Sequence, residues 1–201
     1  MKKLTPLKIV IHLIGIFPFA KLVFDYFTNN LSPNRIQDLE QQTGFAAITL
    51  LILSLSITPL RILFNWRALS KYRRTLGLYA FFYATLHVSI YTAIDYAFDW
   101  SLLFEATLEK RYTLIGTTAY LLLIPLAITS YKWGMKKIGK NWKKLHQLVY
   151  LISPMLIFHF AWARKGDIFS LQGNVLLPLI YGVIVILLLL LRIPVVRDMR
   201  K

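Results

Sequence analysis

Apolar stretches long enough to cross a lipid bilayer recur six times in this 201-residue chain and constrain its fold more than any other feature. They lie at about 6–27, 44–64, 75–96, 113–131, 145–163 and 175–193. A membrane helix needs about 20 mostly apolar residues. Hydrophobic residues make up 57% of the chain, more than the roughly 45–50% of soluble domains. The sequence therefore predicts an all-α integral membrane protein, a six-transmembrane-helix bundle that forms one domain over 1–201.

The charges of the connecting segments predict the orientation of this bundle. Most of the 24 lysines and arginines lie in the N-terminal stretch, the second and fourth connections and the C-terminal tail. The acidic residues, apart from Asp198, lie towards the opposite ends of the segments. Because cytoplasmic loops of membrane proteins are enriched in Lys and Arg, we expect both termini in the cytoplasm. The same pattern accounts for the net charge of +15 without any nucleic-acid partner, since the basic loops lie against the lipid bilayer.

The chain contains no cysteine, which limits its redox chemistry. Disulfides, thiolate-bound iron–sulfur clusters, covalently attached c-type haem and a cysteine nucleophile are all excluded. A bound metal must therefore use histidine or oxygen ligands.

Two of the four histidines are predicted to lie at similar depth in the membrane. From the cytoplasmic ends of their segments, His87 lies about 18 Å in and His159 about 21 Å in, given the helical rise. Ala80, Ala84 and Tyr91 flank His87 and leave space for a flat macrocycle. Two neutral imidazoles on different helices can ligate haem iron from both sides. The alternative is a pair of unrelated histidines, each hydrogen-bonded inside the bundle.

The remaining polar candidates lie near the cytoplasmic side. His146 precedes His159 by about 20 Å of helical rise, a spacing that suits a second haem, or it lies at the headgroup level. Arg73 and Arg74 are candidates to pair with haem propionates or a flavin phosphate, and the alternative is that they anchor the helix in the interface. For His12 we expect a polar contact inside the bundle.

These residues carry a family resemblance. The stretches RRTLGLYAFFYATLHVSIY (73–91) and GKNWKKLHQLVYLISPMLIFHFAW (139–162) resemble the MsrQ (YedZ) family, the haem-binding membrane subunits of a bacterial periplasmic methionine sulfoxide reductase system. The likeness extends over LKIVIHLIGIFPF (7–19), ITPLR (57–61) and KRYTLIG (110–116). That family belongs to the ferric-reductase-like transmembrane superfamily, which also contains the NADPH oxidases.

The resemblance implies a haem b protein of the bacterial cell inner membrane, with one or two haems and an association with FMN. Such a protein passes electrons from the quinone pool to a periplasmic molybdopterin-containing methionine sulfoxide reductase, which repairs oxidised proteins. It is an electron-transfer subunit and not itself the sulfoxide-reducing catalyst. The resemblance assigns His87, His146 and His159 to haem iron. Where NADPH oxidases carry a further histidine in this helix, the present chain has Arg73 and Arg74.

Two other functions remain open from the residues alone. A transmembrane reductase of ferric iron or another acceptor would need the same haem site. A proton-coupled transporter that uses histidine as a relay would need a path of ionisable residues through the spans. Beyond the histidines the spans offer only Lys21 and Asp25, whose spacing predicts a local ion pair.

Overall fold

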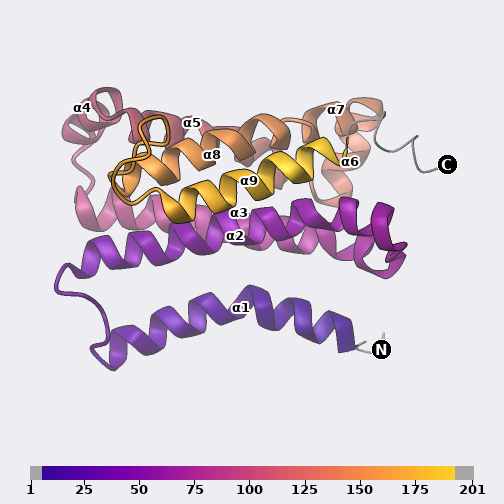
Figure 1. Cartoon of the computed structure of the whole chain (residues 1–201), viewed down its shortest axis with the longest axis horizontal. Helices are drawn as coiled ribbons and strands as arrows, with labels where there is room; N and C mark the ends of the chain where they lie inside the picture. Colours follow the sequence, from indigo (N-terminus) through magenta and orange to yellow (C-terminus); the bar gives the residue numbers. More distant parts are fainter. Residues whose placement is uncertain (1–5, 193–201) are drawn as a thin grey trace.

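The structure, a computed structural model, describes residues 6–192 and is all-helical over that range (Figure 1). The long helices are α1 (Pro6–Phe27), α2 (Arg35–Phe64), α3 (Arg73–Ile90), α5 (Arg111–Ile128), α8 (Val149–Ala163) and α9 (Leu176–Leu190). They run along the long axis of the molecule, and α1 begins at the end where α9 finishes (Figure 1). The described part contains no β-strand, only one isolated bridge between Asp167 and Gln172. The prediction of an all-α protein is thus confirmed for these residues.

Short helices close the two ends of the bundle. At one end lie η1 (Arg67–Tyr72), α6 (Lys132–Ile138), η3 (Gly139–Asn141) and α7 (Trp142–His146). At the other end, a π-helical turn, η2 (Tyr91–Asp95), extends α3 and is followed by α4 (Trp100–Glu109). The basic connections of the sequence therefore meet at the end that carries α6 and α7 (Figure 1).

Four helical stretches are long and apolar enough to cross a membrane: Pro6–Phe27, Arg35–Phe64, Arg67–Asp95 and Arg111–Ile128. A fifth span results if Lys132–His146 and Val149–Ala163, which meet at a bend of 50°, count as one. Helix α9, with 15 residues, is apolar but shorter. The chain is a multi-pass membrane protein by these criteria. The termini, 1–5 and 193–201, lie outside the described residues, so the expected end of the last segment at 193 is not covered.

Several helix boundaries differ from those expected. Helix α2 begins at Arg35 rather than near residue 44, because Asn34 caps it by accepting a hydrogen bond from the Gln37 N–H at 3.2 Å. The segment expected at 145–163 is interrupted after His146, where the Tyr150 N–H bonds to the Gln147 carbonyl at 2.9 Å in a tighter turn. Helix α4 forms inside a connection expected to be a loop.

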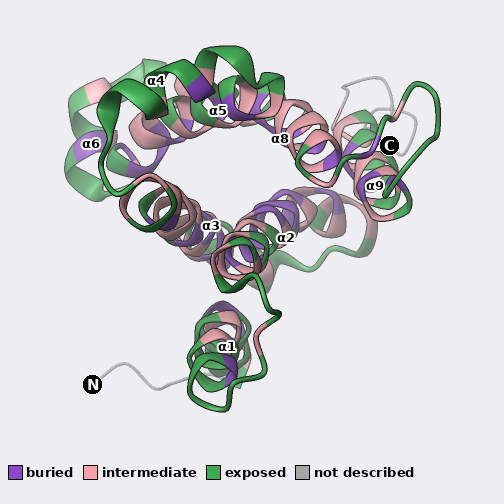
Figure 2. Cartoon of the chain, turned by 90° about the vertical axis from the view of Figure 1, so that its left-hand side faces the viewer, coloured by how far each residue is buried: buried purple, intermediate pink, exposed green. Residues whose placement is uncertain are grey.

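The core lies where α2 and α3 pack against α5 and α8. Its buried side chains include Leu50, Leu51, Leu76, Ala80, Tyr83, Ala119, Leu123 and Ile152. Helix α1 stands outside this group of helices (Figure 2). Its Leu13 and Phe17 are 62% and 66% exposed, as expected for side chains that face lipid. The predicted ion pair between Lys21 and Asp25 on α1 is present.

Candidate functional site

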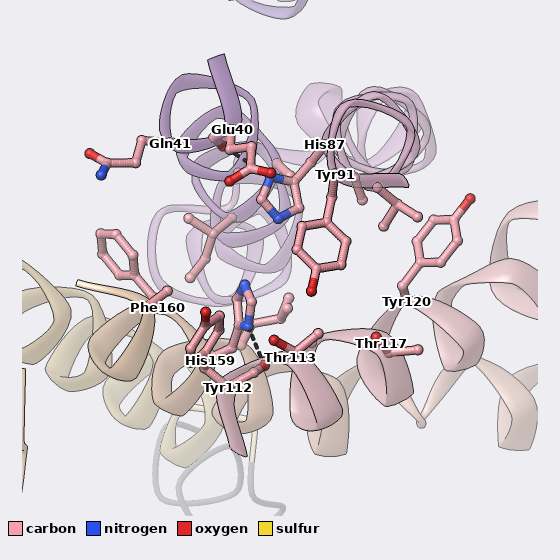
Figure 3. Close-up of a pocket in the computed structure, with 18 of the residues that line it drawn as sticks. Glu40, Gln41, His87, Tyr91, Tyr112, Thr113, Thr117, Tyr120, His159 and Phe160 are labelled. Atoms are coloured by element: carbon pink, nitrogen blue, oxygen red, sulfur yellow. Dashed lines mark hydrogen bonds between the residues drawn. The ribbon is translucent and has the colours of Figure 1, made fainter. Parts of the chain in front are cut away.

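A cavity of about 350 Å³ lies between the α2–α3 pair and the α5–α8 pair. His87 from α3 and His159 from α8 face each other across it (Figure 3). Ala80, Ala84 and Tyr91 also line this cavity, as the sequence suggested. Its size falls in the range of cofactor sites, and its position between helices of a bundle is a usual place for a prosthetic group.

The two imidazoles are held in the same way from opposite sides. The Nδ1 of His87 lies 2.9 Å from the backbone carbonyl of Glu40, and the Nδ1 of His159 lies 2.7 Å from that of Tyr112. A carbonyl only accepts, so each Nδ1 carries the proton and donates it. In the neutral form of each ring, the other nitrogen, Nε2, then keeps a free lone pair. A metal-binding histidine is commonly oriented by such a contact, which also raises the basicity of the ligating nitrogen.

The separation of the rings fits one metal ion between them. Their centroids are 6.1 Å apart and their planes are inclined by 81°. A metal at about 2 Å from each nitrogen, with about 1.1 Å more from nitrogen to ring centre, would place the centroids about 6.2 Å apart. Among residues 6–192 no group of three or more His, Cys, Asp or Glu side chains could hold a metal ion. The site thus offers two imidazole ligands, and a macrocycle would have to supply the others.

Two glycines allow the helices to approach the imidazoles. A methyl group at Gly44 on α2 would lie 3.3 Å from Nδ1 of His87, and one at Gly116 on α5 would lie 2.5 Å from Nδ1 of His159. Each glycine stands one helical turn after the carbonyl that orients the ring, Glu40 or Tyr112. Both carbonyls precede their histidine by 47 positions, so one arrangement occurs twice. Sequence reasoning missed all four residues, although the equal spacing from glycine to histidine was a usable signal.

Unpartnered polar atoms gather at the same cavity. Glu40 Oε1, the Tyr91 hydroxyl and Thr113 Oγ1 are buried and make no hydrogen bond of normal geometry within the described chain. All three residues line the cavity, and the Tyr91 hydroxyl points towards Thr113 (Figure 3). Lys110 and Arg164 also line it and carry positive charge. Because an unsatisfied buried polar group is costly, the two hydroxyls, together with the two cations, suit a ligand with acidic edges, such as a porphyrin with its propionates.

The other predicted site residues lie elsewhere. His146 stacks on Trp142 with ring centroids 4.0 Å apart, and its Nε2 is 3.4 Å from the Ser130 hydroxyl. Arg73 donates to the Thr58 hydroxyl at 3.4 Å, and the Arg74 guanidinium lies over the Tyr131 ring. None of these three side chains lines the cavity that holds His87 and His159.

His12 has a partner that the sequence did not suggest. Its Nδ1 lies 2.8 Å from the Tyr79 hydroxyl on α3. The expected polar contact inside the bundle is thus present.

A helical membrane bundle that presents two opposed imidazoles is a framework for haem-based electron transfer, and comparison with known proteins agrees. Residues 43–157 match the family of ferric reductase like transmembrane components. The MsrQ protein of Xanthomonas axonopodis pv. citri (strain 306) is 38% identical over 167 residues, which cover 80% of this chain and 77% of that protein. The MsrQ of Herminiimonas arsenicoxydans is 37% identical over 192 residues, 95% of this chain and 86% of its own length. Both are named protein-methionine-sulfoxide reductase heme-binding subunits. The chain therefore belongs to the MsrQ family, and the resemblance read from its sequence is confirmed.

Proposed function

We propose that the protein is a haem b electron-transfer subunit that passes electrons from the quinone pool to a periplasmic molybdopterin methionine sulfoxide reductase. The observation that carries this proposal is the pair of imidazoles on α3 and α8, 6.1 Å apart and each with Nε2 unengaged by the helices that hold it. The names of the relatives supply the haem and the methionine sulfoxide reductase system. The repair of oxidised methionines belongs to the partner, and this chain moves the electrons.

His87 and His159 would hold the haem iron. When bound, the haem supplies a one-electron carrier. The two histidines would supply two nitrogen ligands to the iron, an arrangement that favours electron transfer over oxygen binding. The carbonyls of Glu40 and Tyr112 hold the proton of each imidazole on Nδ1 and orient the two rings, so that each Nε2 would face the iron. The hydroxyl of Thr113 is a donor positioned for a polar edge of the macrocycle.

The proposed topology is a single domain with six spans and both termini in the cytoplasm of a bacterium, the protein lying in the inner membrane. The alternating long helices and the basic end at α6 and α7 support it (Figure 1). Helix α9, with its 15 residues, is about 22 Å long and thus shorter than the hydrocarbon core. Arg192, two residues after its end, donates to the Tyr150 hydroxyl and to the Leu55 carbonyl, and mismatch of this size is tolerated by local thinning.

The partner would dock at the opposite end, which carries α4. Asp99, Glu105 and Glu109 lie beside Lys110 and Arg111 and form a mixed-charge surface. Lys110 donates to the Tyr96 hydroxyl at 3.3 Å, and this bond raises the pKa of its ammonium group, so it stays charged at neutral pH. Mixed charges suit a transient complex that forms quickly and in one orientation. His87 lies towards this end, which shortens the last electron transfer.

A second haem at His146 and an FMN near Arg73 and Arg74 form a finer part of the proposal. The half-buried imidazole of His146 and the two guanidinium groups all lie at the basic end of the bundle. Guanidinium groups bind propionates and phosphates alike. His146→Ala is expected to reduce the haem content partially or shift the spectrum, leaving the haem at His87 and His159 in place.

Substitution of the two cavity histidines tests the haem site. We expect His87→Ala and His159→Ala each to abolish this haem, because each removes one of its two protein ligands. The measurement is haem per chain and the reduced-minus-oxidised spectrum of purified protein. His12→Ala is the matched control, since His12 lies outside the cavity. Unchanged haem content and an unchanged low-spin spectrum in either cavity variant would refute the assignment.

The direction of electron flow is tested with the partner. The quinol-reduced protein should be reoxidised when the periplasmic methionine sulfoxide reductase and methionine sulfoxide are both present. Retention of reduced haem under these conditions, together with rapid reoxidation by ferric chelates, would instead favour a ferric reductase. A purified protein that binds no haem at all would favour the transporter.

A further inference from the structure

A second cavity, of about 450 Å³, lies between α1 and α3. His12, Gly15, Ile16 and Phe19 line it from α1, and Arg74, Thr75, Leu78, Tyr79, Phe82 and Tyr83 line it from α3. We call it the α1–α3 groove. Both helices belong to candidate membrane spans, and the lining side chains Ile16 and Phe82 are 50% and 48% exposed. The groove therefore opens to the hydrocarbon region, so that a molecule dissolved in the bilayer can enter it from the side.

Tyr83 holds α1 against α3 at one end of the groove. Its hydroxyl accepts from the Phe19 N–H at 2.9 Å and donates to the Gly15 carbonyl at 2.8 Å. The hydroxyl thus bonds to two backbone groups of α1 that lie four residues apart, and it ties α1 to α3. The groove is therefore bounded at this end by a direct link between the two helices.

The polar groups of the groove lie at the other end. His12 and Tyr79 each stand about 9 Å from the start of their helices, at the basic end of the bundle. Because the Nδ1 of His12 is engaged with the Tyr79 hydroxyl, the second ring nitrogen, Nε2, is left for a ligand. Arg74 adds a positive charge beside them. A flat ligand with oxygen atoms on its ring matches aromatic walls that carry one hydrogen-bonding pair.

The groove also lies next to the haem cavity. Helix α3 separates the two spaces: Tyr79 and Phe82 line the groove, whereas Ala80 and His87 line the cavity. From Tyr79 to His87 the distance along the helix axis is about 12 Å, and the helix is about 10 Å across. A redox-active occupant would therefore be separated from the haem by a single helix.

We propose that the α1–α3 groove is the quinol-binding site, with His12 and Tyr79 as the groups that bind the quinol ring. This inference rests on the proposed function, in which quinol is the electron donor. One quinol gives up two protons and two electrons. The haem would accept the electrons one at a time. In the tautomer whose Nδ1–H donates to the Tyr79 oxygen, Nε2 of His12 has a free lone pair, and the first proton moves from a ring hydroxyl to this nitrogen and from there to water at the basic end. The second follows the same route, and quinone leaves sideways into the bilayer.

Binding is tested with an azido-quinone photolabel on the haem-loaded protein in nanodiscs. We expect the label on peptides of α1 and α3 and its displacement by decylubiquinone. Ile16→Trp fills the groove without changing a polar group, and His12→Leu and Tyr79→Phe each remove one hydrogen-bonding partner. Each variant should lower labelling about tenfold, the effect expected for a lost contact of this kind. Leu13→Trp is the control, because Leu13 is 62% exposed and does not line the groove.

Reduction kinetics give the second measurement. Decylubiquinol should reduce the haem about tenfold more slowly in the three groove variants than in wild type, while dithionite reduces all of them fully. An unchanged haem spectrum shows that a variant is folded. Label on other helices, or displacement by phospholipid but not by quinone, would overturn the groove assignment. Equal rates in wild type and variants would overturn it too and leave the proposed function intact. A wild-type haem that dithionite reduces and quinol does not would overturn the quinol step itself.

Discussion

Gly116 and Gly44 occupy equivalent places beside His159 and His87, but the space for an added methyl group differs greatly between them. A methyl group at Gly116 would stand 2.5 Å from Nδ1 and 2.6 Å from Cε1 of His159, whereas ordinary contact begins at 3.4 Å. The ring would have to retreat by about 0.9 Å, well beyond the roughly 0.2 Å tolerance of a metal–ligand distance. At Gly44 the corresponding distances to His87 are 3.3 and 3.4 Å. Gly44→Ala therefore requires almost no movement.

The retreat of His159 also affects the bond that orients it. Tyr112 and Gly116 are on the same helix, so a ring that moves away from the glycine also stretches its 2.7 Å bond to the Tyr112 carbonyl, by up to about 0.9 Å, and so weakens or breaks it. Loss of such an orienting contact typically lowers metal affinity about 10–100-fold. We expect Gly116→Ala to weaken haem binding by that factor and Gly44→Ala by less than about threefold.

The assay is titration of haem-free protein with haemin, followed by the low-spin spectrum at saturation. Gly77→Ala is the matched control, because a methyl group there meets only the Ser54 hydroxyl, at 3.5 Å. Wild-type affinity in Gly116→Ala, or a larger loss in Gly44→Ala than in Gly116→Ala, would show that the imidazoles are not held as described.

Three further predictions follow from other parts of the molecule. A cytoplasmic reporter fused near Lys137 should be active, and activity of a periplasm-only reporter there would overturn the topology. Since the planes of His87 and His159 are inclined by 81°, the ferric haem should give a strongly anisotropic low-spin resonance, and the rhombic signal of parallel imidazoles would contradict this. Hydrogen bonds from the Ser170 hydroxyl and the Phe169 N–H lower the pKa of the Asp167 carboxyl. The stabilisation that the ionised carboxyl gives to the turn it forms with these residues is therefore complete above about pH 4 and is lost as the pH falls further. Hydrogen exchange at the Phe169 amide should show this loss, and Asp167→Asn should remove the pH dependence.

The sequence predicted those features that depend on one helix at a time. Residues 6–27 form α1 with the expected bounds, because their apolar character and length suffice to define a membrane helix. The matched depth of His87 and His159 followed from a fixed helical rise, and the structure brings the two rings together. The ion pair of Lys21 and Asp25 followed from helical spacing in the same way.

Features that depend on how helices are rotated against one another were not predictable. Axial rise does not say which backbone carbonyl faces a histidine, so Glu40 and Tyr112 were missed. Nor does it say which neighbour a side chain meets laterally, and so Tyr79 was not foreseen as the partner of His12. Helix α4 was missed because its 10 residues are too few to give a membrane-span signal, although Asp99 caps it by accepting from the Leu102 N–H at 3.0 Å.

The repeated arrangement, in which the carbonyl of one helix orients a histidine 47 residues later, has a consequence for biogenesis. Each imidazole is oriented by a carbonyl of its own helix pair, α2 with α3 for His87 and α5 with α8 for His159. The α2–α3 pair, which contains His87, is synthesised before the α5–α8 pair, which contains His159. Each pair therefore contains only one of the two histidines. Haem held as proposed, by His87 and His159 together, would bind only when the two helix pairs meet, and it would then join two pairs that are each already folded in the membrane.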